Sequence, residues 1–425
     1  MPLLKGDITE VENNIISRMH EYLEQIVKES GVTIPHTALE KSIYNNGNRT
    51  AIANVSRKAL RGEDITICAF GGSITRGSGS DVNPLEESGI RHSLDQKDYN
   101  YLDYVCEFWE NAFSCKVTKV NAGMGATDTV YGVHRMEEDV LQYHPDLVIV
   151  EWCCNDGKDQ LYKQATYEAI VRRLLETNTA LIILSMATAR GVSSQILHEP
   201  ISDWYAVPMI SYRDAYGDMQ EYRYLSTDGT HPNKVGYALA GLLVNHFLME
   251  TLQEQEHIDR KVSTCREDVF CEESMYYHGA KILTLKDIHD GKIEGARITD
   301  MGSFDMDKEV SKFVFREYYG FTARYAEQYA PLVIELDVCK TLFLQIYRNT
   351  VFWGTDFYVE LNGKKRTSNT FTCKHGTDNT QVEWSYHWAT ERLCNHPTAE
   401  KVVLKIYPAV ANKEAFVRLF ALLVS

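Results

Sequence analysis

The feature that most constrains this sequence is the alternation of short apolar runs with longer helical segments between Asp64 and about residue 250. Alternation of this kind is typical of a parallel sheet that is covered by helices on both faces. We expect the strands at 65–70, 116–120, 147–152, 180–185 and 207–210, and the helices near 99–113, 128–142, 159–176 and 234–250. The sequence therefore predicts a doubly wound α/β domain with a five-stranded parallel sheet.

The pattern changes after about Glu256, where the long helical segments disappear. Apolar and polar residues alternate over Leu332–Val338, and 357–361 runs into Asn362-Gly363, a strong signal for a two-residue hairpin. Residues 402–406 and 416–424 add further strands. These features predict a C-terminal all-β domain, a jelly-roll-like sandwich.

Three segments follow from these patterns: an N-terminal helical extension over 1–63, the α/β domain over 64–256 and the β-sandwich over 257–425. Residues 9–29 of the extension have helical spacing and begin with a capping box, Thr9-x-x-Glu12. An amphipathic helix of this kind serves either packing or oligomerisation, so a homo-oligomer stays open.

Charge and cysteine content exclude several classes of partner. The formal net charge of −15 repels polyphosphates, so we expect no nucleic acid and no anionic membrane as partners. The ten cysteines include no CxxC pair and no zinc-like spacing with histidine, which predicts free thiols and no metal. We find no signal peptide and no apolar run of membrane-spanning length, and therefore expect a cytoplasmic protein with a neutral substrate.

Ser73 follows the first predicted strand directly, in the segment Gly71-Gly72-Ser73. A side chain in this position faces the crevice at the carboxyl end of a parallel sheet, where open α/β folds bind ligands. Thr75 stands where the nucleophile elbow G-x-S-x-G requires glycine, and no Gly-Lys-Ser/Thr follows as in a P-loop. Taken alone, the segment fits an ordinary turn as well as a nucleophile.

Three further segments lie after predicted strands or before a predicted helix: 121–128 (NAGMGATD), 151–156 (EWCCND) and 226–233 (STDGTHPN). The first could direct backbone N–H groups, and Asn155 of the second a side-chain amide, at a developing oxyanion. In the third, Asp228 precedes His231 by three residues, a spacing that lets a carboxylate bond Nδ1–H and leaves Nε2 for a hydroxyl. Each of these residues alone also fits a turn or a helix cap.

The four segments GGSIT, NAGMGAT, CCND and DGTHPN, in this order, resemble the sequence blocks of the SGNH (GDSL-like) hydrolase superfamily over about residues 64–250. The resemblance implies an SGNH-type α/β/α sandwich and an esterase without a cofactor. Ser73 would be the nucleophile, His231 the general base and Asp228 the carboxylate that orients it. The oxyanion hole would comprise Asn155 and the N–H groups of Ser73 and of either Gly125 or Ala126.

The sequence departs from the family pattern at two positions. Gly72 stands where Gly-Asp-Ser has its aspartate, a variant that resembles the carbohydrate-esterase branches, and Cys153 replaces a glycine of the third block. Together with the appended β-domain, this resemblance implies a serine esterase that removes O-acetyl groups from xylan or mannan oligosaccharides. The alternatives are a lipid, aryl or thioester hydrolase of the same fold and, from another class, a non-catalytic carbohydrate-binding protein.

An aromatic row in the β-domain bears on the substrate. Trp384, Tyr386 and Trp388 alternate in sequence and would therefore lie on one face of a strand. Trp384 and Trp388 are accordingly candidates for stacking on sugar rings, although such rows also fill the cores of sandwiches.

Overall fold

The computed structural model of the protein describes residues 5–35, 37–81, 94, 97–113, 115–157, 161–254, 265–313, 316–347, 355–365, 388–410, 413 and 416–425. The chain divides into two units. The first comprises the residues up to Ser274 without Val133–Arg135, and the second comprises these three residues and Met275–Ser425. Residues 1–63 thus lie in the same unit as the α/β domain.

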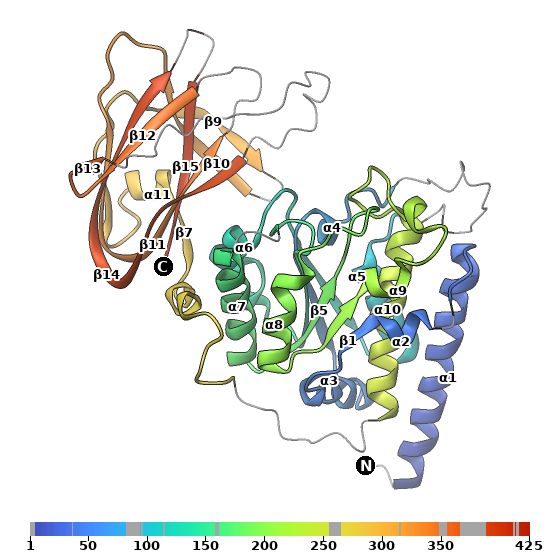
Figure 1. Ribbon diagram of the computed structural model, residues 1–425. Helices are drawn as coiled ribbons and strands as arrows, with labels where there is room; N and C mark the ends of the chain where they lie inside the picture. The colour runs from blue at the N-terminus through green and yellow to red at the C-terminus, as the bar shows by residue number, and fades with distance from the viewer. Residues whose placement is uncertain are drawn as a thin grey trace. The chain divides into compact units, whose positions relative to one another are not determined.

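A sheet in the order β1-β6-β5-β4-β2-β3 forms the centre of the first unit (Figure 1). Its strands are β1 (Ile43–Asn45), β2 (Ile65–Gly71), β3 (Val117–Gly123), β4 (Leu147–Glu151), β5 (Ala180–Ser185) and β6 (Met209–Ser211). Strands β2 to β6 run parallel, which confirms the predicted doubly wound domain. The strand number was wrong, because β1 pairs antiparallel with β6 and makes the sheet six-stranded. A strand of three residues has too little periodicity to be recognised without its partner.

Strand β2 is the point at which the direction of winding reverses. It pairs with β3 on one side and with β4 on the other, so that Gly71 lies beside both Gly123 and Glu151. In open α/β sheets, ligands bind at the carboxyl ends of the strands that flank such a reversal. The crevice predicted for the functional residues therefore lies between the ends of β2 and β4.

Helices cover both faces of this sheet (Figure 1). They are α1 (Lys5–Ser30), α2 (Ala38–Ser42), α3 (Thr50–Leu60), α4 (Ser73–Arg76), α5 (Tyr101–Ala112), α6 (Thr129–Asp139), α7 (Leu161–Glu176), α8 (Gln195–Tyr205), α9 (Tyr212–Tyr216) and α10 (Lys234–Gln253), with short 3₁₀ turns at Leu141–Tyr143 and Tyr222–Leu225. One core joins α1, α3, α5 and α10 to the sheet residues Ile67, Ala69 and Ile149. Residues of the opposite face, such as Phe70, pack toward Trp152.

Helix α10 is the most apolar helix of the described chain. Its length and composition would suffice to cross a membrane, although the sequence showed no continuous apolar run of that length. Nearly all of its residues are buried within the first unit, where it packs on α1 and α5. Its composition is that of a central core helix.

The second unit is antiparallel throughout, which confirms the predicted C-terminal all-β domain. Its strands are β7 (Lys281–Thr284), β8 (Ala296–Asp300), β9 (Asp305–Phe313), β10 (Arg316–Arg324), β11 (Leu332–Tyr347), β12 (Thr355–Leu361), β13 (Lys364–Lys365), β14 (Trp388–Val410) and β15 (Phe416–Val424), with the helix α11 (Leu285–His289) and a 3₁₀ turn at Glu272–Tyr277. Strands β11 and β14 pair along most of their length, and β11 pairs on its other side with β8 and then with β15. Residues of alternate positions, such as Leu332, Ile334 and Leu336, fill the core.

The predicted hairpin at Asn362-Gly363 is confirmed. Asn362 has φ of 48° and Gly363 has φ of 77°, as a two-residue turn of type I′ requires. The turn joins β12 to β13, where Leu361 pairs with Lys364.

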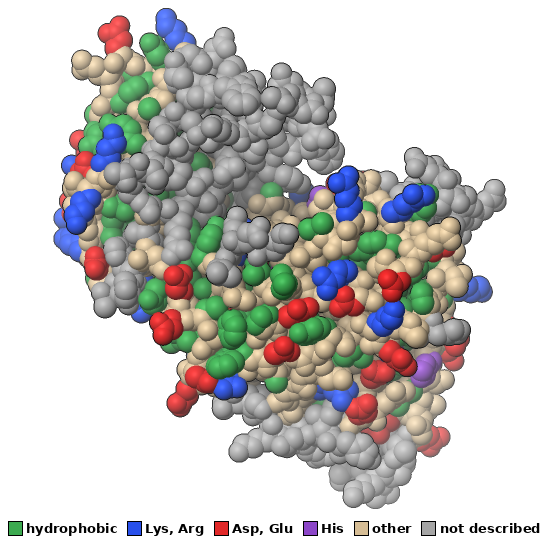
Figure 2. Space-filling model, in the orientation of Figure 1, with side chains coloured by type: hydrophobic (Ala, Val, Ile, Leu, Met, Phe, Trp, Pro, Cys, Tyr) green, Lys and Arg blue, Asp and Glu red, His purple; other side chains and the backbone are tan. Residues whose placement is uncertain are grey.

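Acidic and basic side chains are interspersed on the face shown in Figure 2, where red and blue atoms alternate among apolar ones. On this face the acidic side chains are thus not gathered in one patch.

One carboxyl group lies inside the first unit, at the end of β4. Glu151 is fully buried, and this burial raises the pKa of its side chain to about 7. Hydrogen bonds from the Cys153 N–H and the Thr75 hydroxyl act in the opposite direction and lower it. In the unfolded chain the same group titrates near 4.5.

We predict that Glu151 makes the protein less stable as the pH rises from about 4.5 to 7. Over this range the folded state keeps a proton that the unfolded state has lost, so the free energy of unfolding falls with increasing pH. A shift of about 2.5 pH units corresponds to a loss on the order of 3 kcal/mol. Denaturant unfolding of the wild type and Glu151→Gln between pH 5 and pH 8 measures this loss as a difference between the two proteins. Identical pH profiles for the two proteins would contradict the prediction.

Candidate active site

Ser73 is the first residue of the short helix α4, directly after β2 and Gly72. Its side chain lies at the carboxyl end of the sheet and is only 6% exposed. The helix ends at Arg76, and the following Gly77 has a φ of 100°, a left-handed conformation that favours glycine. Strand, glycine turn and one helical turn therefore place the serine as the sequence predicts.

His231 and Asp228 meet Ser73 from the loop before α10. His231 Nε2 lies 2.8 Å from Ser73 Oγ, and His231 Nδ1 lies 2.7 Å from Asp228 Oδ2. The second carboxylate oxygen, Asp228 Oδ1, accepts hydrogen bonds from the N–H groups of Thr230 and His231, each at 2.9 Å. The three predicted residues thus form one chain of contacts from carboxylate to imidazole to hydroxyl.

These contacts keep Asp228 charged. Partial burial acts against ionisation, but the hydrogen bonds from the His231 N–H, the His231 ring and the Thr230 N–H outweigh it and lower the pKa of Asp228 below its ordinary value. A carboxylate at Nδ1 holds that nitrogen in the protonated form and leaves Nε2 to accept a proton from Ser73.

The histidine loop is held in place by its own backbone and by the serine segment. Ser226 Oγ donates to the carbonyl of His231 and accepts from the Gly229 N–H, at 2.9 Å and 3.0 Å. Thr227 Oγ1 donates to the carbonyl of Gly79 at 3.3 Å, which joins this loop to the segment after Ser73. Tyr237 of α10 reaches the same segment, with its hydroxyl 2.9 Å from the Ile74 carbonyl.

Asn155 lies beside the serine turn, on the turn that follows β4. A Cβ atom on Gly72 would come within 2.3 Å of Asn155 Oδ1, so the two residues are in direct contact. In this structure, a side chain at position 72 would therefore have to displace the Asn155 amide. The structure therefore brings Asn155 to the serine turn, beside Gly72, while its role in an oxyanion hole stays a prediction.

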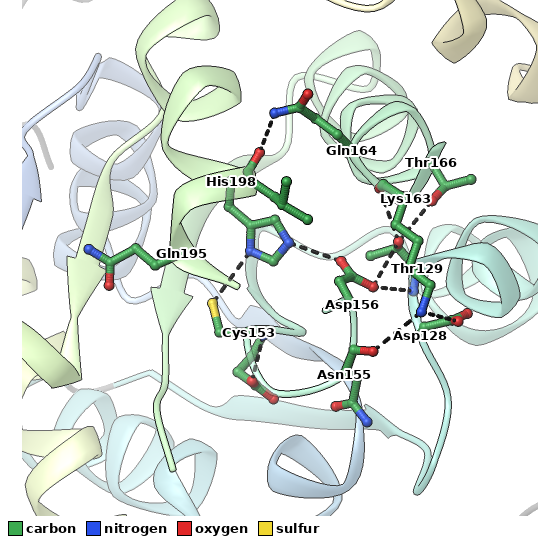
Figure 3. A network of polar contacts seen from close by, with 12 residues as sticks. Asp128, Thr129, Cys153, Asn155, Asp156, Lys163, Gln164, Thr166, Gln195 and His198 are labelled. Atoms are coloured by element: carbon green, nitrogen blue, oxygen red, sulfur yellow. Dashed lines mark hydrogen bonds and ion pairs between the residues drawn. The ribbon is translucent and has the colours of Figure 1, made fainter. Parts of the chain in front are cut away.

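A buried polar network lies behind the Asn155 turn (Figure 3). His198 Nε2 lies 2.9 Å from Asp156 Oδ2, its Nδ1 lies 3.4 Å from Cys153 Sγ, and the ring stacks on Tyr167. Asp156 Oδ1 accepts from the N–H and the hydroxyl of Thr129, each at 3.0 Å. The turn is thereby tied to the start of α6 and to α8.

The contacts of His198 in this network favour its protonated form. Burial lowers the pKa of His198, but Cys153 and Asp156 at its two ring nitrogens more than offset this and raise the pKa to about 10. Cys153, the second departure from the family pattern, is thus a partner of His198. Its Sγ atom also lies 3.3 Å from the hydroxyl oxygen of Ser185.

The remaining candidate residues are the oxyanion-hole alternatives Gly125 and Ala126 and the two tryptophans of the β-domain. Gly125 is buried, whereas Ala126 is exposed and has φ of 57°, and the choice between their N–H groups stays a prediction. Trp384 lies outside the described residues. The backbone of Trp388 begins β14 opposite Tyr347, and its side chain is not described. The sugar-stacking role of the two tryptophans therefore stays a prediction.

Two residues beside the sequence blocks, Trp152 and Asp128, have structural roles. Trp152 packs against Phe70 with ring centroids 4.7 Å apart and belongs to the core. Asp128 caps the N-terminus of α6 and pairs with Lys163 at 2.8 Å.

Within the described part of the chain, no group of three or more His, Cys, Asp or Glu residues is arranged to hold a metal ion.

Sequence analysis did not identify Glu151, Thr75, Asp156 and His198 as parts of this site. One signal was available for Glu151, since a carboxylate that ends an otherwise apolar strand is unusual. His198 gave no such signal, because its contact with Asp156 joins residues from different elements.

Comparison with known proteins bears on the family and on the fold. Residues 69–239 match the family described as GDSL-like Lipase/Acylhydrolase. No curated protein matches the chain in sequence.

Among solved structures, the chain is similar to a two-domain esterase (CEX) active on acetylated mannans. The identity is 22%, the TM-score is 0.71, and the match covers 91% of this chain and 98% of that one. The same esterase co-crystallized with mannopentaose gives the same identity and TM-score, over 93% and 99% of the two chains. At this low identity, the structural likeness shows the fold alone. The match in fold extends over both units. The resemblance of residues 69–239 to the SGNH (GDSL-like) hydrolases is thus confirmed, within a chain that has the two-domain fold of this esterase.

Proposed function

We propose that the protein is a serine esterase that removes O-acetyl groups from carbohydrates, with acetylated mannan or xylan oligosaccharides as substrates. The observation that carries the proposal is the line of contacts Asp228–His231–Ser73, at 2.7 Å and 2.8 Å. Residues in this arrangement turn a hydroxyl into a nucleophile, because the imidazole removes the proton as the oxygen attacks.

In the proposed reaction, Ser73 Oγ attacks the acetyl carbonyl carbon and its proton passes to His231 Nε2. The tetrahedral intermediate collapses as His231 gives this proton to the departing sugar oxygen, which leaves acetyl-Ser73. Water then attacks the acetyl group and gives a proton to His231. When the second intermediate collapses, acetate is released and Ser73 recovers its proton. Asn155 would donate to the oxyanion in both intermediates, together with the N–H groups of Ser73 and of Gly125 or Ala126.

The choice of substrate rests on the shared fold and on the second unit. The fold is shared with an esterase active on acetylated mannans, and the second unit is an appended all-β domain, as in that esterase. The proposed partner is therefore an acetylated oligosaccharide. We also propose the cytoplasm as the location.

We predict that Ser73→Ala abolishes hydrolysis of 4-nitrophenyl acetate, with a loss on the order of 10⁴-fold or more. The side chain is small, so the fold should be unchanged by circular dichroism. Ser80→Ala, which removes a hydroxyl further along the same segment, is the control and should keep wild-type activity. More than a tenth of wild-type activity in purified Ser73→Ala would exclude the serine mechanism.

Asn155→Ala is expected to lower kcat by about 10²- to 10³-fold with little change in KM, because the amide would act on charge that develops only in the transition state. Gly72→Ala should lower kcat in the same manner, since the added methyl group displaces the Asn155 side chain. The double variant should be no slower than Asn155→Ala alone. A change confined to KM would mean that Asn155 binds the substrate instead.

The substrate class is tested with acetylated manno- and xylo-oligosaccharides, by mass spectrometry of the deacetylated products. If the second unit contributes sugar contacts, Trp384→Ala and Trp388→Ala should slow deacetylation of the oligosaccharides and leave hydrolysis of 4-nitrophenyl acetate unchanged, because binding energy from distant parts of a substrate is used at the reacting group. Unchanged rates on oligosaccharides in folded variants would contradict a role for these tryptophans.

The alternative functions are tested with simple esters. Equal rates on acetyl and octanoyl esters would favour a lipid esterase, and no hydrolysis of any ester would favour a binding protein.

A further inference from the structure

The side chain of Glu151 has no role in the proposed reaction. It is the last residue of β4, and its side chain is fully buried at the carboxyl edge of the sheet, where Ser73 and Asn155 meet. A buried carboxyl group is costly to the fold because it must give up its hydration. An apolar residue would end this strand at lower cost, so the contacts of the carboxyl group need an explanation.

The two carboxyl oxygens of Glu151 go to two different turns. Oε2 accepts from Thr75 Oγ1 at 3.3 Å, and Thr75 belongs to the helical turn that begins with Ser73. Oε1 accepts from the Cys153 N–H at 3.1 Å, and Cys153 belongs to the turn that carries Asn155. The carboxyl group therefore bridges the turn of the nucleophile and the turn of the amide.

The backbone of Glu151 adds a third contact on the same side. Its carbonyl accepts from the Gly72 N–H at 3.2 Å, and Thr75 Oγ1 is also 2.8 Å from the hydroxyl of Tyr101 on α5. The serine turn is thus anchored at both ends, and at the start of the Asn155 turn the Cys153 N–H donates to Glu151.

The other end of the Asn155 turn is held separately, by the Asp156–His198 pair and Thr129 (Figure 3). These are also the charged groups that face Glu151: His198 favours its ionisation, and Asp156 opposes it. Removal of the Glu151 carboxyl would therefore release the Cys153 N–H at the start of the turn, while the contacts of Asp156 at its other end stay in place.

We propose that Glu151 is a positioning residue, which sets the place of the Asn155 amide relative to Ser73 by bridging their two turns. The proposal rests on the proposed esterase function. It predicts that the carboxyl group acts on the transition state through Asn155, without touching the substrate.

Glu151→Ala removes both bridging contacts and should lower kcat on 4-nitrophenyl acetate by about 10²-fold, since a displacement on the order of 1 Å at a reacting centre has an effect of this size. KM should change by less than about 3-fold, because the ground state does not use the oxyanion contact. Glu151→Gln is the matched control. Its amide oxygen can accept from the Cys153 N–H and its amino group can donate to Thr75 Oγ1, so we expect it to retain most of the wild-type kcat.

A double-mutant cycle with Asn155→Ala separates positioning from a general structural role. If Glu151 acts through Asn155, Glu151→Ala should lower kcat by less than about 3-fold in the Asn155→Ala background. An equal factor in both backgrounds would overturn the proposal, and so would a wild-type kcat for Glu151→Ala. If Glu151→Ala does not fold, the same cycle with Thr75→Val, which removes one bridging contact, decides by the same criterion.

The experiments distinguish a failure of the proposed esterase function from a failure of the proposed role of Glu151. Activity that survives Ser73→Ala would remove the esterase mechanism and this inference with it. A dead Ser73→Ala variant combined with an additive cycle would remove only the role of Glu151.

Discussion

The parallel pairing of β2 with β4 is the constraint on which the candidate site depends. Their register sets Gly71 beside Glu151, so the chain leaves both strands at the same level of the sheet. Ser73 and Asn155 follow at short distances along the chain, and each is carried by a tight turn. Because strand pairing is a rigid backbone contact, it brings the nucleophile and the amide together without relying on long flexible side chains.

The parts of the site that could be predicted from sequence are those whose geometry is local. Asp228 and His231 are three residues apart in one loop, so the carboxylate can reach both the ring and the backbone of the histidine. Ser73 follows a strand of seven residues with only Gly72 between them, and its exit from the sheet depends on two adjacent glycines. The hairpin at Asn362-Gly363 was predictable for the same reason, since two adjacent residues define its turn.

Contacts between distant elements could not be predicted in this way. Helix α8 contains Pro200, a residue that normally interrupts a helix, and so its helical pattern was not recognised. His198 lies on that helix, which left the partner of Asp156 unknown until the fold was available. The edge strand β1 was missed because three residues next to proline, asparagine and glycine form a strand only when β6 provides hydrogen bonds.

Burial divides the polar residues of the site into two groups with different tasks. The side chains of His231 and Asp228 are 17% and 52% exposed, so protons can be exchanged with water, as the release of an acyl group requires. The side chains of His198 and Asp156 are each 1% exposed, and there water cannot compete for their hydrogen bonds. An interaction that must move protons benefits from contact with solvent, whereas one that must hold a turn in place benefits from its exclusion. The buried network therefore suits the positioning of Asn155 and Ser73, and the half-exposed pair suits the chemistry.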